Sequence, residues 1–429
     1  MNKIITFTLG LLVMSQANAQ QKRTDVLIMG SGSPSYKNEV YYSVENGVID
    51  SAQVRNWDLG FSAPGNFDGR FYGITANHSN GVHIHPYRKG GIAHWSTFDT
   101  TGWKSNAELI NSDTAWDKGA FNHGPELHPR YGWGVYNSSG QIDGDSLYLV
   151  GFGTYPNYTS FKKLWIQQVK SSGGVKIWKF RYSNLDGSAD SSVTLDMTNY
   201  QKRNFAYYSM RNNVAINREP DNTKWDLVLG RYYGLQPGTN TYYQVTGILQ
   251  NYGVTAAKAS KVDTGTVDYL NYLNKFQTNI STIGSNWKLL NNATFQYYLD
   301  DSLAYFVKNI KGDIYKITFT DNFYSATGKT TINSTRVFTN TSSVNSFEKN
   351  NFISVYPNPA SETVTVIMDN KNITSCEITD ITGKTMITKI VNESGFIQIA
   401  MPVSTLAPGV YMIKAFADNK MYISKFIKN

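Results

Sequence analysis

The feature that most constrains the fold is an internal duplication in the middle of the chain. Two segments, residues 40–61 and 205–229, contain Tyr-Tyr-Ser, an Asn turn, a short strand, a polar stretch and Trp-Asp-Leu in the same order. A Gly-Arg-aromatic-Tyr-Gly string then follows each segment, at 69–73 and 230–234. The match resumes at Asp-Ser-Leu, residues 145–147 and 301–303, and at two late strands, 177–180 and 314–317. This order predicts two related domains, 34–196 and 197–335.

The composition predicts that both domains are antiparallel β-structures. Aromatic residues make up 14% of the chain and occur in short segments broken by Gly, Asn, Asp and Ser, without long helical periods. The predicted fold class is therefore mainly β.

In each of the two Trp-Asp pairs, Trp57-Asp58 and Trp225-Asp226, the indole is predicted to lie in the core. The carboxylate is predicted to accept hydrogen bonds from local backbone N–H groups where the strand begins, and a role as a catalytic acid is the alternative.

The N-terminus predicts export. Lys3 is followed by an apolar stretch, Ile4 to Met14, and by a small-x-small cleavage sequence, Ala17-Asn18-Ala19. This is the pattern of a signal peptide over residues 1–19. The apolar stretch is much shorter than the roughly 20 residues that a membrane-spanning helix needs, so no membrane span is predicted. Residues 20–33 are predicted to be a first strand or an ordered N-terminal arm.

The C-terminal segment, residues 352–429, resembles a known secretion signal. It contains YPNP at 356–359, DITGK at 380–384, LAPGVYMIK at 406–414 and KFIKN at 425–429. This pattern resembles the C-terminal sorting domain of type IX secretion. The resemblance implies an Ig-like β-sandwich, recognition by the type IX secretion machinery, and a secreted or outer cell-surface location reached through the periplasm. Residues 336–351, rich in Asn, Ser and Thr, are predicted to be the linker before it.

The second repeat carries short strings that point to a family. They are WDLV at 225–228, IGSNW at 283–287, AYFVK at 304–308 and GDIYKITF at 312–319. Their order resembles the HmuY-type family of secreted or surface-attached β-rich proteins, the best known of which bind haem. The resemblance extends more loosely to the first repeat. It implies two HmuY-like antiparallel β domains, with haem or a related porphyrin as the ligand.

The overall chemistry of the chain excludes several functional classes. The net charge is +8, but the lysines and arginines are scattered among acidic residues, so nucleic-acid binding is not predicted. Cys376, inside the C-terminal segment, is the only cysteine, which excludes disulfides and a thiol nucleophile from the central region. No nucleophile elbow, zinc-protease helix or phosphate-binding loop is present, and we expect a protein that is not an enzyme.

The histidines are the most distinctive chemical feature of the central region. All six lie in the first repeat: His78, His83, His85, His94, His123 and His128. The string NHSNGVHIH at 77–85 contains Asn-Gly, which predicts a hairpin turn that places His78 opposite His83. His83 and His85 would then share one strand face, and three imidazoles would converge. Such a group could bind a transition-metal ion or haem iron, and the other interpretation, exposed strand and loop histidines that bind nothing, remains open.

Two functional hypotheses follow from these features. The first is a secreted or cell-surface, non-enzymatic binding protein that captures haem, a related tetrapyrrole or a metal ion. The second is a surface adhesion, glycan-binding or interaction protein in which the duplicated domains serve as a scaffold. The aromatic and Asn-rich loops favour the second hypothesis.

Overall fold

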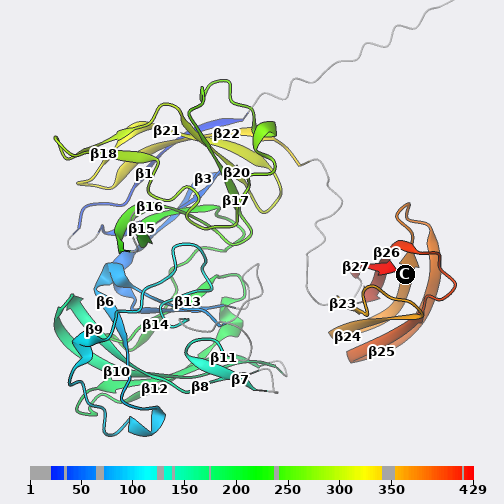
Figure 1. The fold of residues 1–429 in the computed structure, drawn as a ribbon, viewed down its shortest axis with the longest axis horizontal. Helices are drawn as coiled ribbons and strands as arrows, with labels where there is room; N and C mark the ends of the chain where they lie inside the picture. Colours follow the sequence, from blue (N-terminus) through cyan, green and yellow to red (C-terminus); the bar gives the residue numbers. More distant parts are fainter. Residues whose placement is uncertain are drawn as a thin grey trace, which may run out of the picture. The chain divides into compact units, whose positions relative to one another are not determined.

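A computed structural model describes residues 21–32, 36–63, 72–122, 130–137, 141–172, 175–235, 241–340, 353–417 and 420–429. The chain forms two compact units, 1–340 and 341–429 (Figure 1). The described residues form antiparallel sheets joined by turns and short 3-10 helices, which confirms the mainly-β prediction. No helix among them is long and apolar enough to cross a membrane.

The larger unit contains the strands of both repeats. β1 (Lys22–Ile28) precedes the first repeat. The strands of the first repeat are β2 (Asn38–Ser43), β3 (Gly47–Gln53), β4 (Leu59–Ser62), β5 (Ile74–Ala76), β6 (Val82–Pro86), β7 (Gly134–Asn137), β8 (Gln141–Gly144), β9 (Leu147–Thr154), β10 (Asn157–Ser172), β11 (Val175–Asn184) and β12 (Ser191–Asp196). Those that follow are β13 (Phe205–Ser209), β14 (Val214–Ile216), β15 (Leu227–Leu235), β16 (Tyr242–Gln250), β17 (Thr255–Ser260), β18 (Lys288–Asn291), β19 (Gln296–Leu299), β20 (Leu303–Lys308), β21 (Ile314–Tyr324) and β22 (Lys329–Phe338). The 3-10 helices are η1 (Val54–Asn56), η2 (His78–Asn80), η3 (Ile92–His94), η4 (Trp103–Ser105), η5 (Met197–Tyr200) and η6 (Tyr269–Tyr272).

Two sheets of the larger unit have the same strand order. One contains five strands that are paired in the order β12-β11-β10-β9-β6. The other runs β1-β22-β21-β20-β17. In this comparison β10 is the counterpart of β21, and β11 is the counterpart of β22. The late strands aligned from the sequence, in β11 and β21, therefore do not hold equivalent positions in the two sheets.

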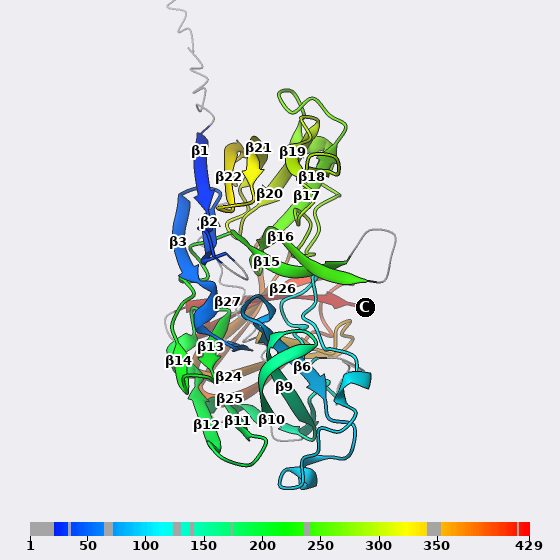
Figure 2. The ribbon, with the colours of Figure 1, turned by 90° about the vertical axis from the view of Figure 1, so that its left-hand side faces the viewer.

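The repeats exchange their opening strands. β2, from the first repeat, pairs with β15 of the second, while β13 of the second repeat pairs with β4 of the first. As a result β2 and β3 complete a sheet with β15 and β16 (Figure 2). In the same way β13 and β14 complete a sheet with β4 and β5. Each Tyr-Tyr-Ser strand thus lies beside the Trp-Asp-Leu strand of the other repeat.

The aspartates of the two Trp-Asp pairs fix this exchange. The backbone N–H of Asp58 donates to Tyr208 O, and that of Asp226 donates to Tyr42 O, each at 2.8 Å. The Asp226 carboxylate accepts from the backbone N–H of Val44 at 2.9 Å. The Asp58 carboxylate accepts from the backbone N–H of Arg211 at 3.1 Å. The carboxylates bind backbone N–H groups as predicted for such residues, but these groups belong to the other repeat and are not local.

The two largest hydrophobic cores divide the larger unit into two lobes. The first core uses buried residues between Leu59 and Met210, and we call residues 57–216 the first lobe. The second core uses Leu27 to Val44 together with Leu227 to Ile332, and we call residues 22–53 and 225–338 the second lobe. The predicted boundary between 196 and 197 is therefore not the boundary between the cores. β13 pairs with β4, and its residues Ala206 and Tyr208 are buried in the first core. β13 and β14, which directly follow residue 196 in the strand order, therefore belong to the first lobe.

The predicted N-terminal arm is an integral strand of the second lobe. β1 pairs with β22 over its whole length, from Lys22 opposite Thr335 to Ile28 opposite Lys329. Leu27, in this strand, is 1% exposed and belongs to the second core. The signal peptide predicted at 1–19 and most of the predicted linker, 341–351, lie outside the described residues.

The smaller unit has a core of its own. Its strands are β23 (Ile353–Tyr356), β24 (Thr363–Thr379), β25 (Thr385–Pro402), β26 (Gly409–Ala417) and β27 (Lys420–Lys428). They are ordered β23-β24-β26-β27, and β25 pairs along β24. The first part of β24 pairs with β23 and the later part with β26, and the pairing of β24 with β25 shifts register between Met368 and Lys371. Buried side chains, among them Val366, Cys376 and Phe426, fill the space between the strands.

Candidate metal centre

The turn that carries His78 differs from the predicted hairpin. Residues 78–80 form η2, and Gly81 follows in the left-handed conformation at φ 65°. β5 and β6 on either side pair with β4 and β9 and not with each other. The side chains of Asn77 and Asn80 both donate to Trp57 O, at 2.9 Å, which ties the turn to the segment around η1. These hydrogen bonds favour a 3-10 turn over a two-residue hairpin.

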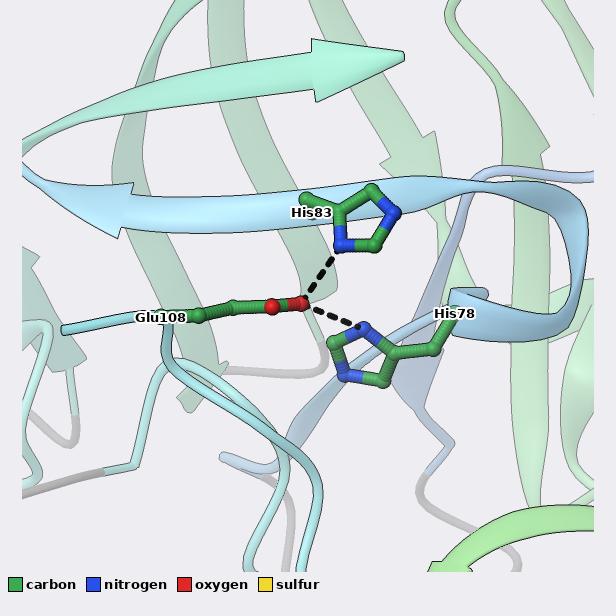
Figure 3. A group of neighbouring side chains, drawn as sticks. All are labelled: His78, His83 and Glu108. Atoms are coloured by element: carbon green, nitrogen blue, oxygen red, sulfur yellow. Dashed lines mark hydrogen bonds and ion pairs between the residues drawn. The ribbon is translucent and has the colours of Figure 1, made fainter. Parts of the chain in front are cut away.

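Two histidines nevertheless meet at one carboxylate (Figure 3). His83 Nδ1 lies 2.7 Å from Glu108 Oε1, and His78 Nδ1 lies 3.4 Å from the same oxygen. The side chains of His78, His83 and Glu108 are 4%, 7% and 16% exposed. Their candidate ligand atoms all lie within 4.8 Å of one another. Within the described ranges, no other group of His, Cys, Asp and Glu side chains meets this condition.

Glu108 was not identified from the sequence. It lies in the segment after η4, and Leu109 beside it forms a β-bridge with Ile84, with Leu109 N donating to Ile84 O at 2.8 Å. This bridge holds Glu108 against the strand that carries His83. An isolated glutamate in a loop has no local pattern that marks it as a ligand, so only the fold reveals its position.

The electrostatics of the three residues favour positive charge between them. Burial alone would raise the pKa of Glu108, but its contacts with the imidazoles of His78 and His83 outweigh this effect and lower the pKa to about 2. Glu108 is therefore a carboxylate at neutral pH. His83 Nε2 lies 3.2 Å from Gly153 O, a hydrogen bond that leaves the Nδ1 lone pair free when Nε2 carries the proton. A backbone carbonyl commonly orients a metal-binding imidazole in this way.

His78 is a buried imidazole whose nitrogens lack good hydrogen bonds. Neither ring nitrogen has a hydrogen-bond partner among the described residues, because the contact with Glu108 is long. Its ring packs edge-on against Tyr233 from β15 of the second lobe, with centroids 4.9 Å apart. Burying polar atoms without partners costs free energy, about 1–3 kcal/mol for each group. A bound cation would remove that cost.

His85 has a different environment although it shares a strand face with His83. Its Nδ1 lies 3.2 Å from Asn106 O and its Nε2 lies 2.8 Å from the Tyr158 hydroxyl, so both nitrogens are engaged. Burial lowers the pKa of His85, against the opposing effect of Asn106 O. Tyr158 also stacks on His83 at 5.0 Å. His85 therefore supports the neighbouring histidine, and the structure does not bring it to Glu108.

The remaining predicted histidines are elsewhere. His94, in η3, is exposed, and its ring lies 6.4 Å from that of Tyr87. His123 and His128 lie outside the described residues. The structure thus brings together two of the six predicted histidines and adds Glu108 as the third potential ligand.

The donor set determines what the centre can hold. Two imidazole nitrogens and one carboxylate oxygen suit zinc and other divalent first-row transition metals. Three protein ligands leave at least one coordination position for water or another small ligand. The same donors occur in catalytic and non-catalytic sites, so the donor set alone does not distinguish between them.

Comparison with known proteins concerns the smaller unit. Residues 354–429 match the family described as Secretion system C-terminal sorting domain. This segment is a sorting domain. The chain is accordingly a secreted or cell-surface protein that is handled by the type IX secretion machinery. The HmuY-type family is not among the matches, and no curated protein matches the chain.

Proposed function

We propose that this secreted or cell-surface protein is a non-enzymatic binding protein that holds a divalent transition-metal ion at His78, His83 and Glu108. The observation that carries the proposal is the buried His78 imidazole, whose nitrogens lack hydrogen-bond partners within the described residues, beside an ionised carboxylate. An ion at this position would bond to His78 Nδ1 or Nε2, to His83 Nδ1 and to Glu108 Oε1.

The geometry favours a bare ion over haem. Haem iron needs an imidazole that projects toward a porphyrin face, whereas His78 and His83 are 4% and 7% exposed and share a carboxylate. Zinc, which has no preference imposed by d-electrons, accepts the mixed nitrogen and oxygen donors. Zinc is therefore the appropriate first probe, and hemin is the probe for the haem alternative.

Zinc titration of the chelator-treated protein tests the proposal. By isothermal calorimetry we expect one site per chain with a Kd of about 1 µM or lower. His83→Ala and Glu108→Gln should each weaken binding at least about 100-fold, because each removes one of three ligands. His94→Ala is the matched control, since His94 is exposed and lies outside the group, and it should bind zinc as the unaltered protein does.

Two results would contradict the proposal. One is the absence of stoichiometric zinc, iron(II) or copper(II) binding by the folded protein. The other is an equal loss of affinity in the His94→Ala control. A saturable Soret shift with hemin that depends on His83 would instead favour haem as the ligand.

A further inference from the structure

A second potential site lies where the two lobes meet. A cavity of about 100 Å³ opens between them. Its lining is strongly aromatic and includes Tyr41, Trp57, Trp116, Tyr207, Trp225 and Tyr232. Trp116 joins the lobes, since its indole N–H donates to Gln250 O at 2.7 Å. The cavity is therefore a feature of the assembled pair of repeats.

The exchange of strands gives this cavity two equivalent aromatic walls. Trp57 packs edge-on against Tyr207, with centroids 4.8 Å apart and an interplanar angle of 72°. Trp225 packs against Tyr41 in the same way, at 5.0 Å and 73°. Each wall thus combines a tryptophan of one repeat with a tyrosine of the other. Flat rings of this kind provide a rigid apolar surface on which a planar ligand can pack.

A buried arginine lies between the walls. Arg218 donates to Glu39 Oε2 at 2.8 Å and to the Tyr41 hydroxyl at 3.4 Å. Its guanidinium lies over the rings of Tyr207 and Trp57, at 4.9 and 5.4 Å. Arg218 is 7% exposed and its partner Glu39 also lines the cavity. The lining therefore contains a fixed positive group whose charge interacts with two carboxyl groups, those of Glu39 and of Glu219, which lines the cavity as well.

Three buried N–H donors of residues that line the cavity lack partners among the described residues, as do the ring nitrogens of His78. Arg218 Nε, Trp57 Nε1 and Trp225 Nε1 have no hydrogen-bond acceptor in the part of the chain that the structure describes. Trp57 and Trp225 are 6% and 3% exposed. A donor buried without an acceptor costs about 1–3 kcal/mol, so a ligand oxygen that accepts from these groups would recover part of that free energy.

We propose that this cavity binds a small aromatic carboxylate. The size fits one ring, because a water molecule needs roughly 10–15 Å³ of such volume and the cavity has room for several. The ring would pack between the tryptophan and tyrosine walls, and the carboxylate oxygens would accept from the unpaired N–H groups. Lys118 and Arg231 also line the cavity and add positive charge to it.

This site is distinct from the metal centre although His78 lines both. Neither the aromatic walls nor Arg218 belongs to the group of metal-ligand candidates. Binding of the carboxylate is therefore expected in the presence of a chelator, and its failure would leave the metal proposal unaffected.

Calorimetric titration of the full-length protein with benzoate, in the presence of EDTA, tests the inference. We expect saturable binding of one benzoate per chain with a Kd below about 1 mM. Toluene, which keeps the ring but lacks an acceptor, should bind at least tenfold more weakly. Trp57→Phe and Trp225→Phe keep an aromatic ring and remove one N–H each, and each should weaken benzoate binding threefold or more.

Trp165→Phe is the matched control, since Trp165 donates to Gly144 O at 3.1 Å and does not line the cavity. It should leave benzoate affinity unchanged, and thermal unfolding of every variant should show that it is folded. The inference is overturned if the folded, unaltered protein shows no saturable binding of benzoate, or if toluene binds as tightly. Wild-type affinity in both cavity variants, or tighter binding of glucose than of benzoate, would also overturn it.

Discussion

At the scale of single residues, the aspartates of the two Trp-Asp pairs show what a sequence pattern can and cannot provide. The pattern predicted that each carboxylate would accept from backbone N–H groups, because short acidic side chains do so at strand starts. The structure has Asp226 accepting from Val44 N, in a segment 182 positions away. The chemistry of the partner was predictable from the residue type, whereas the identity of the partner depends on the exchange of strands.

Replacement of Asp226 should measure the strength of this contact. Asp226→Ala leaves the buried N–H of Val44 without its acceptor, and we expect a loss of about 1–3 kcal/mol in the free energy of unfolding. Asp301→Ala, at an exposed turn, is the control and should change stability by less than about 0.5 kcal/mol. Urea unfolding followed by fluorescence provides both values. Equal effects of the two substitutions would contradict the role given to Asp226.

Glu219 predicts a pH dependence of stability. Burial raises its pKa to about 7, although the N–H groups of Asn204 and Phe205 that donate to it oppose this rise. The folded chain therefore holds a proton between pH 4.5 and 7 that the unfolded chain releases, so this residue makes stability fall as pH rises through that window. The total effect is at most about 3 kcal/mol.

Comparison of Glu219→Gln with the unaltered protein isolates this effect. Glutamine has no charge at either pH, so the variant lacks this contribution to the slope. In urea unfolding at pH 5 and pH 7.5, with EDTA present, the variant should gain stability relative to the unaltered protein at the higher pH. Parallel pH profiles for the two proteins would show that Glu219 does not titrate in this range.

At the scale of elements, the sequence predicted the strands and their duplication better than their partners. Whether a segment forms a strand can be predicted from its own alternation of apolar and polar residues and from its aromatic content, and such segments occur along the whole chain. Pairing between β2 and β15, or between β13 and β4, joins distant segments and has no local signal. The same limit applies to the candidate site. His78 and His83 are five residues apart and could be grouped from the sequence, but Glu108 joins them only through the bridge between Leu109 and Ile84.

The exchange of strands predicts which fragments fold. A fragment of residues 54–218 contains β4 to β14 and the whole first core, whereas the fragment 34–196, predicted from the repeats, lacks β13 and β14. We expect the first fragment to unfold cooperatively in urea and to show a near-ultraviolet circular dichroism signal. The second should show neither, because the buried Ala206 and Tyr208 are missing from its core. Cooperative unfolding of 34–196 alone would contradict the exchange as the basis of the fold.

At the scale of the whole molecule, the secretion signal and the candidate binding sites lie in separate units. The sorting domain has its own core, and the metal-ligand candidates and the aromatic cavity lie in residues 1–340. The only cysteine, Cys376, is buried in the sorting domain, where burial raises its pKa to about 11. A thiol with so high a pKa is largely protonated at neutral pH and is a poor nucleophile. The division implies that export and binding can be removed independently.

Deletion of residues 341–429 should separate the two properties. The truncated chain loses the segment that matches the sorting domain, so in the native host we expect it to accumulate inside the cell envelope and to be absent from the surface and the medium. Because the two lobe cores are formed by residues between Leu27 and Ile332, its thermal unfolding temperature and zinc affinity should equal those of the full-length protein. Cell fractionation, thermal unfolding and calorimetry provide the three measurements.

Glu108→Gln in the full-length chain is the reciprocal variant, which should be exported normally and bind zinc weakly. Normal export of the truncated chain, or a change in its zinc affinity, would show that the units are not independent.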